Sequence, residues 1–399
     1  MISNHLPPED KVYTILCELA SHGVATKEAA EIIDIGTDQY IDFFENEILN
    51  DYIENGGTTC RFFEGQAGSG KTHILHLIES IALNGGYIVS YVELTNDLSF
   101  SEWDMITKNI LEKMSIKVDG HIIKGFPDIL AALERTKTIN KDGLTEMQFE
   151  HPCFQNAIQK AIHRTTLDSD SWNLIRRYLL GEKILVSQFK SHKIKGVKKS
   201  LTKNNAEQVL NTVLNAIQGL GIKGTVIIFD ETDRSWMLSS RKSVPRKVQV
   251  SANLIRRFID GCSSGDIRGT VGIFAVLPNF IRDCSTCYPA LGSRLMMQHE
   301  HFQKIGWRWP LLDTNSVNSL FIDIEDPFEQ RGIFLEEAKK KFKSLIEYCE
   351  GDLGSTDYNF AGVGKEELEK NSGENYKRAV IKALAECSRG CIGIEVWYE

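Results

Sequence analysis

The chain has 399 residues, of which 42% are hydrophobic and 25% charged, so it is long enough for more than one packed unit and ordinary for a globular protein. Its formal net charge of -8 argues against a surface that binds nucleic acid over its whole extent, although it allows a local basic patch. No long apolar run and no basic, then apolar, leader is present, so we expect a cytoplasmic protein that does not enter the membrane.

The N-terminal part of the chain shows a helical pattern. Apolar residues recur at helical spacing at Val12, Ile15, Leu16 and Leu19, and we expect an N-terminal helical segment over residues 1–57. The stretch GVATKEAAEIIDIGTDQYIDFF has the rhythm of a helix-turn-helix module, but the acidic residues of its second helix would be repelled by a phosphate backbone. Helical packing is therefore the preferred interpretation.

From residue 58 the pattern changes to strand, glycine-rich loop, helix and strand, in TTCRFF, EGQAGSG, KTHILHLIESIALN and YIVSYVEL. Residues of about 100–222 contain no comparable strand and predict a helical insertion. Strands resume with TVIIFD and TVGIFAVLPN, whose apolar runs suit strands buried on both faces. We therefore expect an α/β P-loop NTPase core over residues 58–310, with a parallel sheet sandwiched by helices. A C-terminal helical lid should follow over 311–399, and it includes the stretch SVNSLFIDI, which is predicted to be helical.

The loop after the first predicted strand matches the Walker A pattern G-x-x-x-x-G-K-[ST] in full. Its residues are Gly65, Gln66, Ala67, Gly68, Ser69, Gly70, Lys71 and Thr72, with His73 next on the helix. Glycines let backbone N–H groups turn toward phosphate oxygens, and the helix N-terminus adds its positive dipole end. We expect Lys71 to reach the β- and γ-phosphates and Thr72 to hold magnesium. The pattern predicts a nucleoside triphosphate and Mg²⁺ as ligands.

A second motif, of the Walker B kind, lies at the end of the strand TVIIFD, where ligands of open α/β sheets bind. We expect Asp230 to hold the magnesium ion together with Thr72. Glu231 is placed to orient and deprotonate the attacking water. Because a water-activating carboxylate would waste the triphosphate in a transferase, hydrolysis is favoured over phosphoryl transfer to a second substrate.

Four further residues are candidates for the site. Asn279 follows the next predicted strand, where it either senses the γ-phosphate or belongs to an ordinary Pro-Asn turn. Arg294 is the first candidate for an arginine that reaches the γ-phosphate of a neighbouring subunit, with Arg282 second; the alternative is a surface arginine paired with a carboxylate. Arg378, in the predicted lid, either approaches the nucleotide or lies on a solvated helix face.

A run of lysines between Glu182 and Glu207 contains no acidic residue, and this stands out in an acidic chain. Its members are Lys190, Lys193, Lys195, Lys198, Lys199 and Lys203, with His192 among them. Such a run either contacts DNA phosphates or forms a solvated loop.

The stretches ELASHGVATKEAAEIIDIG, RFFEGQAGSGKTHILHLIESIALNGGYIVSYVEL, WNLIRRYLLGEK and GIKGTVIIFDETDRS resemble the P-loop ATP-binding proteins of bacterial BREX-type phage-defence systems. These belong with the AAA-like ATPases of the initiator and clamp-loader sort. The resemblance implies ATP as the nucleotide, Arg294 as the inter-subunit arginine, and a role in anti-phage defence. It also implies assembly as a homo-oligomer or with other defence-system proteins.

Three functions are compatible with these motifs. The leading hypothesis is an AAA-like ATPase that couples hydrolysis of ATP with Mg²⁺ to action on DNA or on a defence effector. The second is a slow nucleotide-dependent switch or scaffold that recruits partners with little turnover. The third, a phosphotransferase, is disfavoured by Glu231. The motifs leave open the oligomer number and the macromolecule acted upon.

Overall fold

The computed structural model describes residues 7–24, 26–144, 147–232, 246–278, 280–295, 321–324, 331–350, 360–370 and 375–392. The chain divides into two compact units. The first unit comprises residues 1–43, 63–80 and 322–399, and the second comprises residues 44–62 and 81–321.

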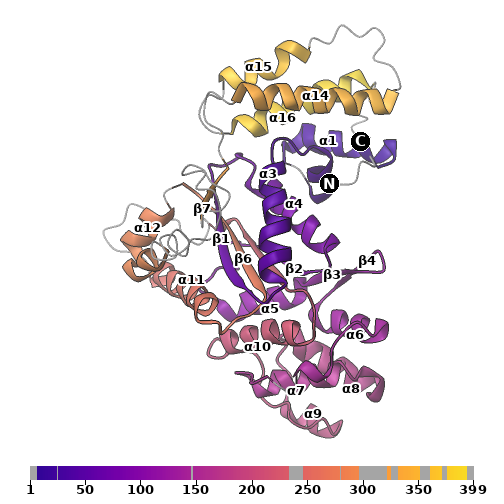
Figure 1. Cartoon of the computed structure of the whole chain (residues 1–399), viewed down its shortest axis with the longest axis vertical. Coiled ribbons are helices and arrows are strands. Elements are labelled where there is room, and N and C mark those ends of the chain that lie inside the picture. The colour runs from indigo at the N-terminus through magenta and orange to yellow at the C-terminus, as the bar shows by residue number, and fades with distance from the viewer. Residues whose placement is uncertain are drawn as a thin grey trace. The chain divides into compact units, whose positions relative to one another are not determined.

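The strands form one sheet in the order β4-β3-β2-β5-β6-β1-β7 (Figure 1). Their bounds are Thr58–Glu64 for β1, Ile88–Glu93 for β2, Ser115–Val118 for β3, His121–Lys124 for β4, Thr225–Asp230 for β5, Thr270–Val276 for β6 and Phe321–Asp323 for β7. Strand β5 pairs in parallel with both β2 and β6, whereas β3 pairs antiparallel with β2 and β4. The predicted α/β class is confirmed, with an antiparallel hairpin added to the parallel strands.

Strands β5 and β6 are buried along their whole length, because their near-continuous apolar sequences place a hydrophobic side chain on each face. Three aromatic rings pack at this part of the core. The ring of Phe274 lies 4.9 Å from that of Phe62 and 5.0 Å from that of Phe229, in stacked arrangements. These rings pack residues of β1, β5 and β6 against one another within the second unit.

Most of the segment between β2 and β5 is helical, as the sequence predicts. Its α-helices are α5 (Trp103–Lys113), α6 (Phe126–Thr136), α7 (Pro152–Ala161), α8 (Ser169–Leu179), α9 (Val186–Ser191) and α10 (Ala206–Gly219). A π-helix, η1 (Phe44–Ile53), precedes β1, and α11 (Arg246–Ser264) and α12 (Phe280–Cys287) flank β6 in the chain.

Two sequence predictions are wrong. Strands β3 and β4 interrupt the segment predicted to contain no strand, and their tight turn consists of Asp119 and Gly120, both with positive φ. An Asp-Gly pair between two short segments that contain β-branched residues is a hairpin signal, and the prediction of helix for this segment overlooked it. Strand β7 lies within SVNSLFIDI, which was predicted to be helical. This short strand is at the edge of the sheet and is hydrogen-bonded to β1.

Helices from both ends of the sequence pack together in the first unit. Its helices are α1 (Glu9–His22), α2 (Lys27–Ile32), α3 (Asp38–Phe43), most of α4 (Lys71–Asn84), α14 (Arg331–Glu350), α15 (Phe360–Lys370) and α16 (Tyr376–Cys391). Helix α16 packs against α1, α14 and α15. The expected N-terminal and C-terminal helices are therefore present, and they share one hydrophobic core.

None of the nine cysteines, all of which lie among the described residues, forms a disulfide bond. Burial raises the pKa of the Cys60 thiol to about 12, so this group is protonated and unreactive at neutral pH. Among the residues that the structure describes, no helix has the length and apolar character needed to cross a membrane.

Replacing Phe274 with alanine should lower the free energy of unfolding by about 3–5 kcal/mol, because the change removes the stacked ring and leaves a cavity beside the rings of Phe62 and Phe229. Urea denaturation measures this change. The matched control is Leu185→Ala, whose side chain is 70% exposed and should contribute less than about 0.5 kcal/mol. Similar losses in the two variants would contradict the core assigned here.

Candidate nucleotide-binding site

The loop between β1 and α4 has a backbone that only glycine accommodates at two positions. Gly68 and Gly70 have φ of 75° and 104°, in the region that side chains disfavour. A Cβ atom on Gly65 would collide with Ser69 Oγ, and one on Gly68 would collide with the side chain of Asn375. Glycine is thus favoured at Gly68 and Gly70 by the backbone conformation, and at Gly65 and Gly68 by the lack of room for a side chain.

Two polar groups of this loop suit an anionic ligand. Lys71 Nζ donates to the carbonyl oxygens of Gly65 and Gln66 at 2.5 and 2.8 Å, which holds the ammonium group over the loop. Ser69 Oγ is buried and has no hydrogen-bond partner among the described residues. Because a buried hydroxyl without a partner costs about 1–3 kcal/mol, a phosphate oxygen at the loop would relieve a cost already present.

Helix α4 begins at Lys71, and its first turn includes Thr72. The amide of Ile74 donates to the carbonyl oxygen of Gly70 at 3.0 Å, which closes this turn. The first turn contains no acidic side chain, so the positive end of the helix dipole is not neutralised locally. The helix start is therefore suited to bind an anion, as the motif predicts.

Polar pairs join α4 to the N-terminal helices of the first unit. His73 Nε2 lies 3.5 Å from Asp34 Oδ1, so this residue, predicted to contact the nucleotide, directs its ring to the segment between α2 and α3. Burial raises the pKa of Asp34, but hydrogen bonds with His73 and Thr37 outweigh it, and the pKa lies below its ordinary value. Two further pairs join the same helices, Lys27 with Glu79 and Glu31 with Ser80.

The start of α16 approaches the loop within the first unit. Asn375, in the left-handed conformation with φ of 65°, precedes this helix and lies against Gly68. The next turn faces other partners, since Arg378 Nε donates to the carbonyl oxygen of His22 at 2.9 Å. Helix α16, for whose Arg378 the sequence left open a nucleotide contact or a solvated helix face, thus directs Arg378 to the end of α1 and brings Asn375 to the loop. No local pattern marks Asn375, because its role depends on contact between distant segments.

In the second unit, Asp230 ends β5 as a buried carboxylate whose two oxygens are both engaged. Tyr91 donates its hydroxyl to Oδ2 at 2.8 Å, and the amide of Glu231 donates to Oδ1 at 2.8 Å. These bonds fix the orientation of the carboxylate. Tyr91 is not marked by any sequence motif. The tyrosine lies beside Asp230 because strand β2 pairs with strand β5.

Glu231 occupies a backbone conformation that is costly for a residue with a side chain. Its φ is 56°, and the residues on either side are fixed, Asp230 as above and Thr232 by donating its hydroxyl to the carbonyl oxygen of Ala275. Left-handed non-glycine residues that persist between fixed neighbours occur often at functional sites. Glu231 thus differs from the adjacent Asp230 in its backbone conformation, which marks it as a candidate functional residue.

The remaining sequence candidates lie in or near α11 and α12. Arg294 Nε lies 2.9 Å from Asp260 Oδ1, and its side chain is 46% exposed. Arg282 is more exposed and lies 3.9 Å from Asp283. Both are surface arginines next to a carboxylate, an arrangement that holds an arginine only weakly. Asn279 lies outside the described residues.

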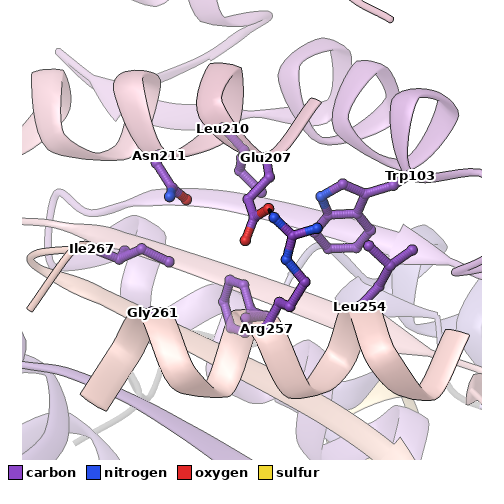
Figure 2. Close-up of a pocket in the computed structure, with 9 residues that line it drawn as sticks. Trp103, Glu207, Leu210, Asn211, Leu254, Arg257, Gly261 and Ile267 are labelled. Carbon is purple, nitrogen blue, oxygen red and sulfur yellow. Dashed lines mark ion pairs between the residues drawn. The ribbon is translucent and has the colours of Figure 1, made fainter. Parts of the chain in front are cut away.

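A separate pocket of the second unit is lined from α5, α10 and α11 (Figure 2). Glu207 and Arg257 point toward one another in this pocket and form an ion pair, beside the indole of Trp103. Burial raises the pKa of Glu207, and the raised value persists although Arg257 opposes it. None of the predicted phosphate-binding or magnesium-binding residues lines this pocket, so we interpret it as a packing feature between helices.

Among the described residues, no group of three or more histidine, cysteine, aspartate or glutamate side chains could hold a metal ion. Mg²⁺, the metal that the sequence predicts, is bound in proteins through one or two side chains together with substrate phosphates and water. Thr72 and Asp230 are oxygen donors of the required kind.

A family model described as "BREX system ATP-binding protein BrxC/D" matches residues 9–130 and 131–308, which is most of the chain. No curated protein and no solved structure matches the chain.

Replacing Glu231 with glycine should give a protein about 1 kcal/mol more stable than the Glu231→Ala variant, because only glycine adopts the left-handed backbone at little cost. Chemical denaturation of both variants measures the difference. At Lys340, an exposed position inside α14, the same pair should show the opposite order by a similar amount. Alanine at least as stable as glycine at position 231 would show that no such strain exists.

Proposed function

Because the chain belongs to the family of BREX system ATP-binding proteins, BrxC/D, we propose that it is an AAA-like ATPase that binds ATP with Mg²⁺ and hydrolyses it in phage defence. The observation that carries this proposal is the pairing of a phosphate-binding loop with a strand that ends in Asp230 and Glu231. In the sheet, the strand before the loop, β1, is separated from β5 by β6 alone.

The loop residues supply the binding half of this function. Backbone N–H groups held by Gly68 and Gly70, the start of α4 and the Lys71 ammonium group together favour a triphosphate. Ser69 adds a buried hydroxyl for which the described part of the chain offers no hydrogen-bond partner. The Thr72 hydroxyl and the Asp230 carboxylate would hold Mg²⁺, which neutralises charge on the phosphates when it is bound.

The end of β5 supplies the hydrolytic half. Asp230 cannot easily turn, since Tyr91 and the Glu231 amide hold both of its oxygens. Glu231 carries its carboxylate on a strained backbone and accepts the proton of the attacking water in our proposal. A residue that holds the metal and a residue that moves the proton are thus adjacent but differently constrained.

Assembly completes the proposed site. Arg294 forms a half-exposed ion pair with Asp260, a contact of the kind that contributes little to stability and that a stronger anion can replace. In a homo-oligomer this arginine would reach the γ-phosphate held by a neighbouring subunit, with Asn279 as a second polar group beside the nucleotide. Other defence-system proteins are the alternative partners.

A second candidate function, a slow nucleotide-dependent switch, is favoured by the contacts around the loop in the first unit. Asn375 lies against Gly68, and His73 contacts Asp34, so the N-terminal and C-terminal helices both touch the phosphate-binding segment. Nucleotide binding would change these contacts and thereby the arrangement of helices that partners recognise.

The Glu231→Gln variant should bind ATP as the wild type does but release phosphate about 10²–10⁴-fold more slowly, because the amide cannot accept the proton of water. Steady-state phosphate release and nucleotide binding measure the two effects. Glu112→Gln, an exposed carboxylate on α5, serves as the control and should leave turnover unchanged. Wild-type protein that binds ATP yet barely turns over, with or without DNA, would replace the hydrolytic function by the switch.

The Tyr91→Phe variant should need about tenfold more Mg²⁺ for half-maximal phosphate release, because Asp230 loses the hydroxyl that orients it. A magnesium titration of the rate gives the value. Tyr288→Phe removes a comparable hydrogen bond to Asn253, of 3.1 Å, and should leave the magnesium requirement unaltered. An equal shift in both variants, or in neither, would count against Asp230 as the magnesium-binding residue.

A further inference from the structure

The end of α9 and the loop that follows it carry five lysines that we call the basic strip: Lys190, Lys193, Lys195, Lys198 and Lys199. Lys190 is on the last turn of α9, and the others lie in the loop that follows. Figure 1 shows α9 with α7 and α8 on the side of α10 away from the sheet. The strip therefore belongs to the helical insertion of the second unit.

Hydrogen bonds from three side chains hold the backbone of the strip. Tyr178 donates its hydroxyl to the carbonyl oxygen of Lys199 at 2.5 Å, and Asn156 donates to that of Gly196 at 3.1 Å. Asn205 donates to the carbonyl oxygen of Ser200 at 3.0 Å. A loop tied at successive positions presents its charges in a fixed arrangement, so little conformational entropy remains to be lost on binding.

The apolar residues of the loop point inward and leave the lysines outside. Ile194, Val197 and Leu201 are buried in the core of the insertion, where Phe189 packs edge-on against Tyr178. All five lysines of the strip are exposed. The alternation of buried apolar and exposed basic residues explains why this sequence forms a charged ridge on a packed base.

Acidic groups near the strip in sequence or space have other partners. Glu182 binds Arg177 at 2.7 Å, Glu102 binds Lys203, and Asp168 accepts hydrogen bonds from Ser171 at the start of α8. Within the described part of the chain, no carboxylate pairs with a lysine of the strip. The strip is thus an uncompensated positive patch on a chain of net charge -8.

We propose that the basic strip binds the phosphate backbone of duplex DNA without regard to base sequence. This deepens the proposed function and rests on it for the biological reason to engage DNA, although the binding itself needs no nucleotide. Lysine is a point charge suited to phosphate, whereas specific base contacts in the major groove come mainly from arginine and amide side chains.

The composition of the strip favours duplex DNA over two other polyanions. Between Lys190 and Lys199 there is no phenylalanine, tyrosine or tryptophan on which unpaired bases would stack, so single strands gain little there. The same stretch exposes no apolar side chain, whereas protein interfaces have an apolar centre. The regularly spaced phosphates of a DNA duplex are a ligand that lysine side chains can bind without aromatic or apolar neighbours.

The test is fluorescence anisotropy of a labelled mixed-sequence duplex with the full chain, over a range of salt concentrations. If all five lysines engage phosphates, the slope of log affinity against log salt should be about -4 to -5. The triple variant Lys193→Gln, Lys195→Gln, Lys198→Gln should reduce the slope to about -2 and weaken binding at low salt by at least about tenfold.

A matched triple variant controls for net charge and folding. Lys113→Gln, Lys124→Gln and Lys137→Gln remove three exposed lysines of the same unit, and Lys137 has a φ of 58° that matches the 56° of Lys193. This control should bind the duplex as the wild type does. An equal loss in both triple variants, or no loss in the strip variant, would overturn the proposal.

Competitors distinguish the possible ligands. Unlabelled duplex should displace the probe better than single-stranded DNA or polyglutamate at equal charge; a better displacement by either of these would assign the strip to that class of ligand instead.

The Glu231→Gln protein separates the two proposals, since it should retain full duplex binding. Duplex binding that survives when no wild-type ATP hydrolysis is found would leave the strip assigned and remove the proposed function alone.

Discussion

A phosphate-binding loop must turn its backbone N–H groups toward one point, and this constraint determines what surrounds it. The left-handed backbone of the loop at Gly68 and Gly70 disfavours side chains, and glycines contribute no side chain to packing. Its neighbours in the first unit hold it instead, with α4 beginning where the loop ends and Asn375 lying against Gly68. The buried hydroxyl of Ser69 has no hydrogen-bond partner among the described residues, which lowers the stability of the loop while no ligand is bound.

The strand end in the second unit sets two adjacent carboxylates in different surroundings. Asp230 is buried and held by two hydrogen bonds, as our proposal requires of a residue that holds a metal ion. Glu231 is less buried and lies on a strained backbone, and in our proposal its side chain accepts the proton of the attacking water. The fully buried strands β5 and β6 position both residues, because rigid strands fix the residues that follow them.

The sequence predicted those features that depend on neighbours along the chain. The Walker A glycines and the buried strands around Phe229 and Phe274 follow from local spacing, and the family assignment agrees with them. Tyr91 and Asn375 were missed because each acts through a partner far away in sequence, which only strand register or helix packing brings close. The β3–β4 hairpin is different, since its Asp-Gly turn was a local signal that the prevailing helical pattern obscured.

The packing of α1 against α16 has a consequence for the synthesis of the chain. Helix α1 buries Val12, Ile15, Leu16 and Leu19, and its main partner is a helix that begins at Tyr376. At about 5–20 residues per second, a ribosome needs roughly 20–70 s to make the intervening segment. During this time the apolar face of α1 lacks that cover, while the second unit already has most of its sequence and can fold. The first unit is therefore the part of the nascent chain that most needs a chaperone.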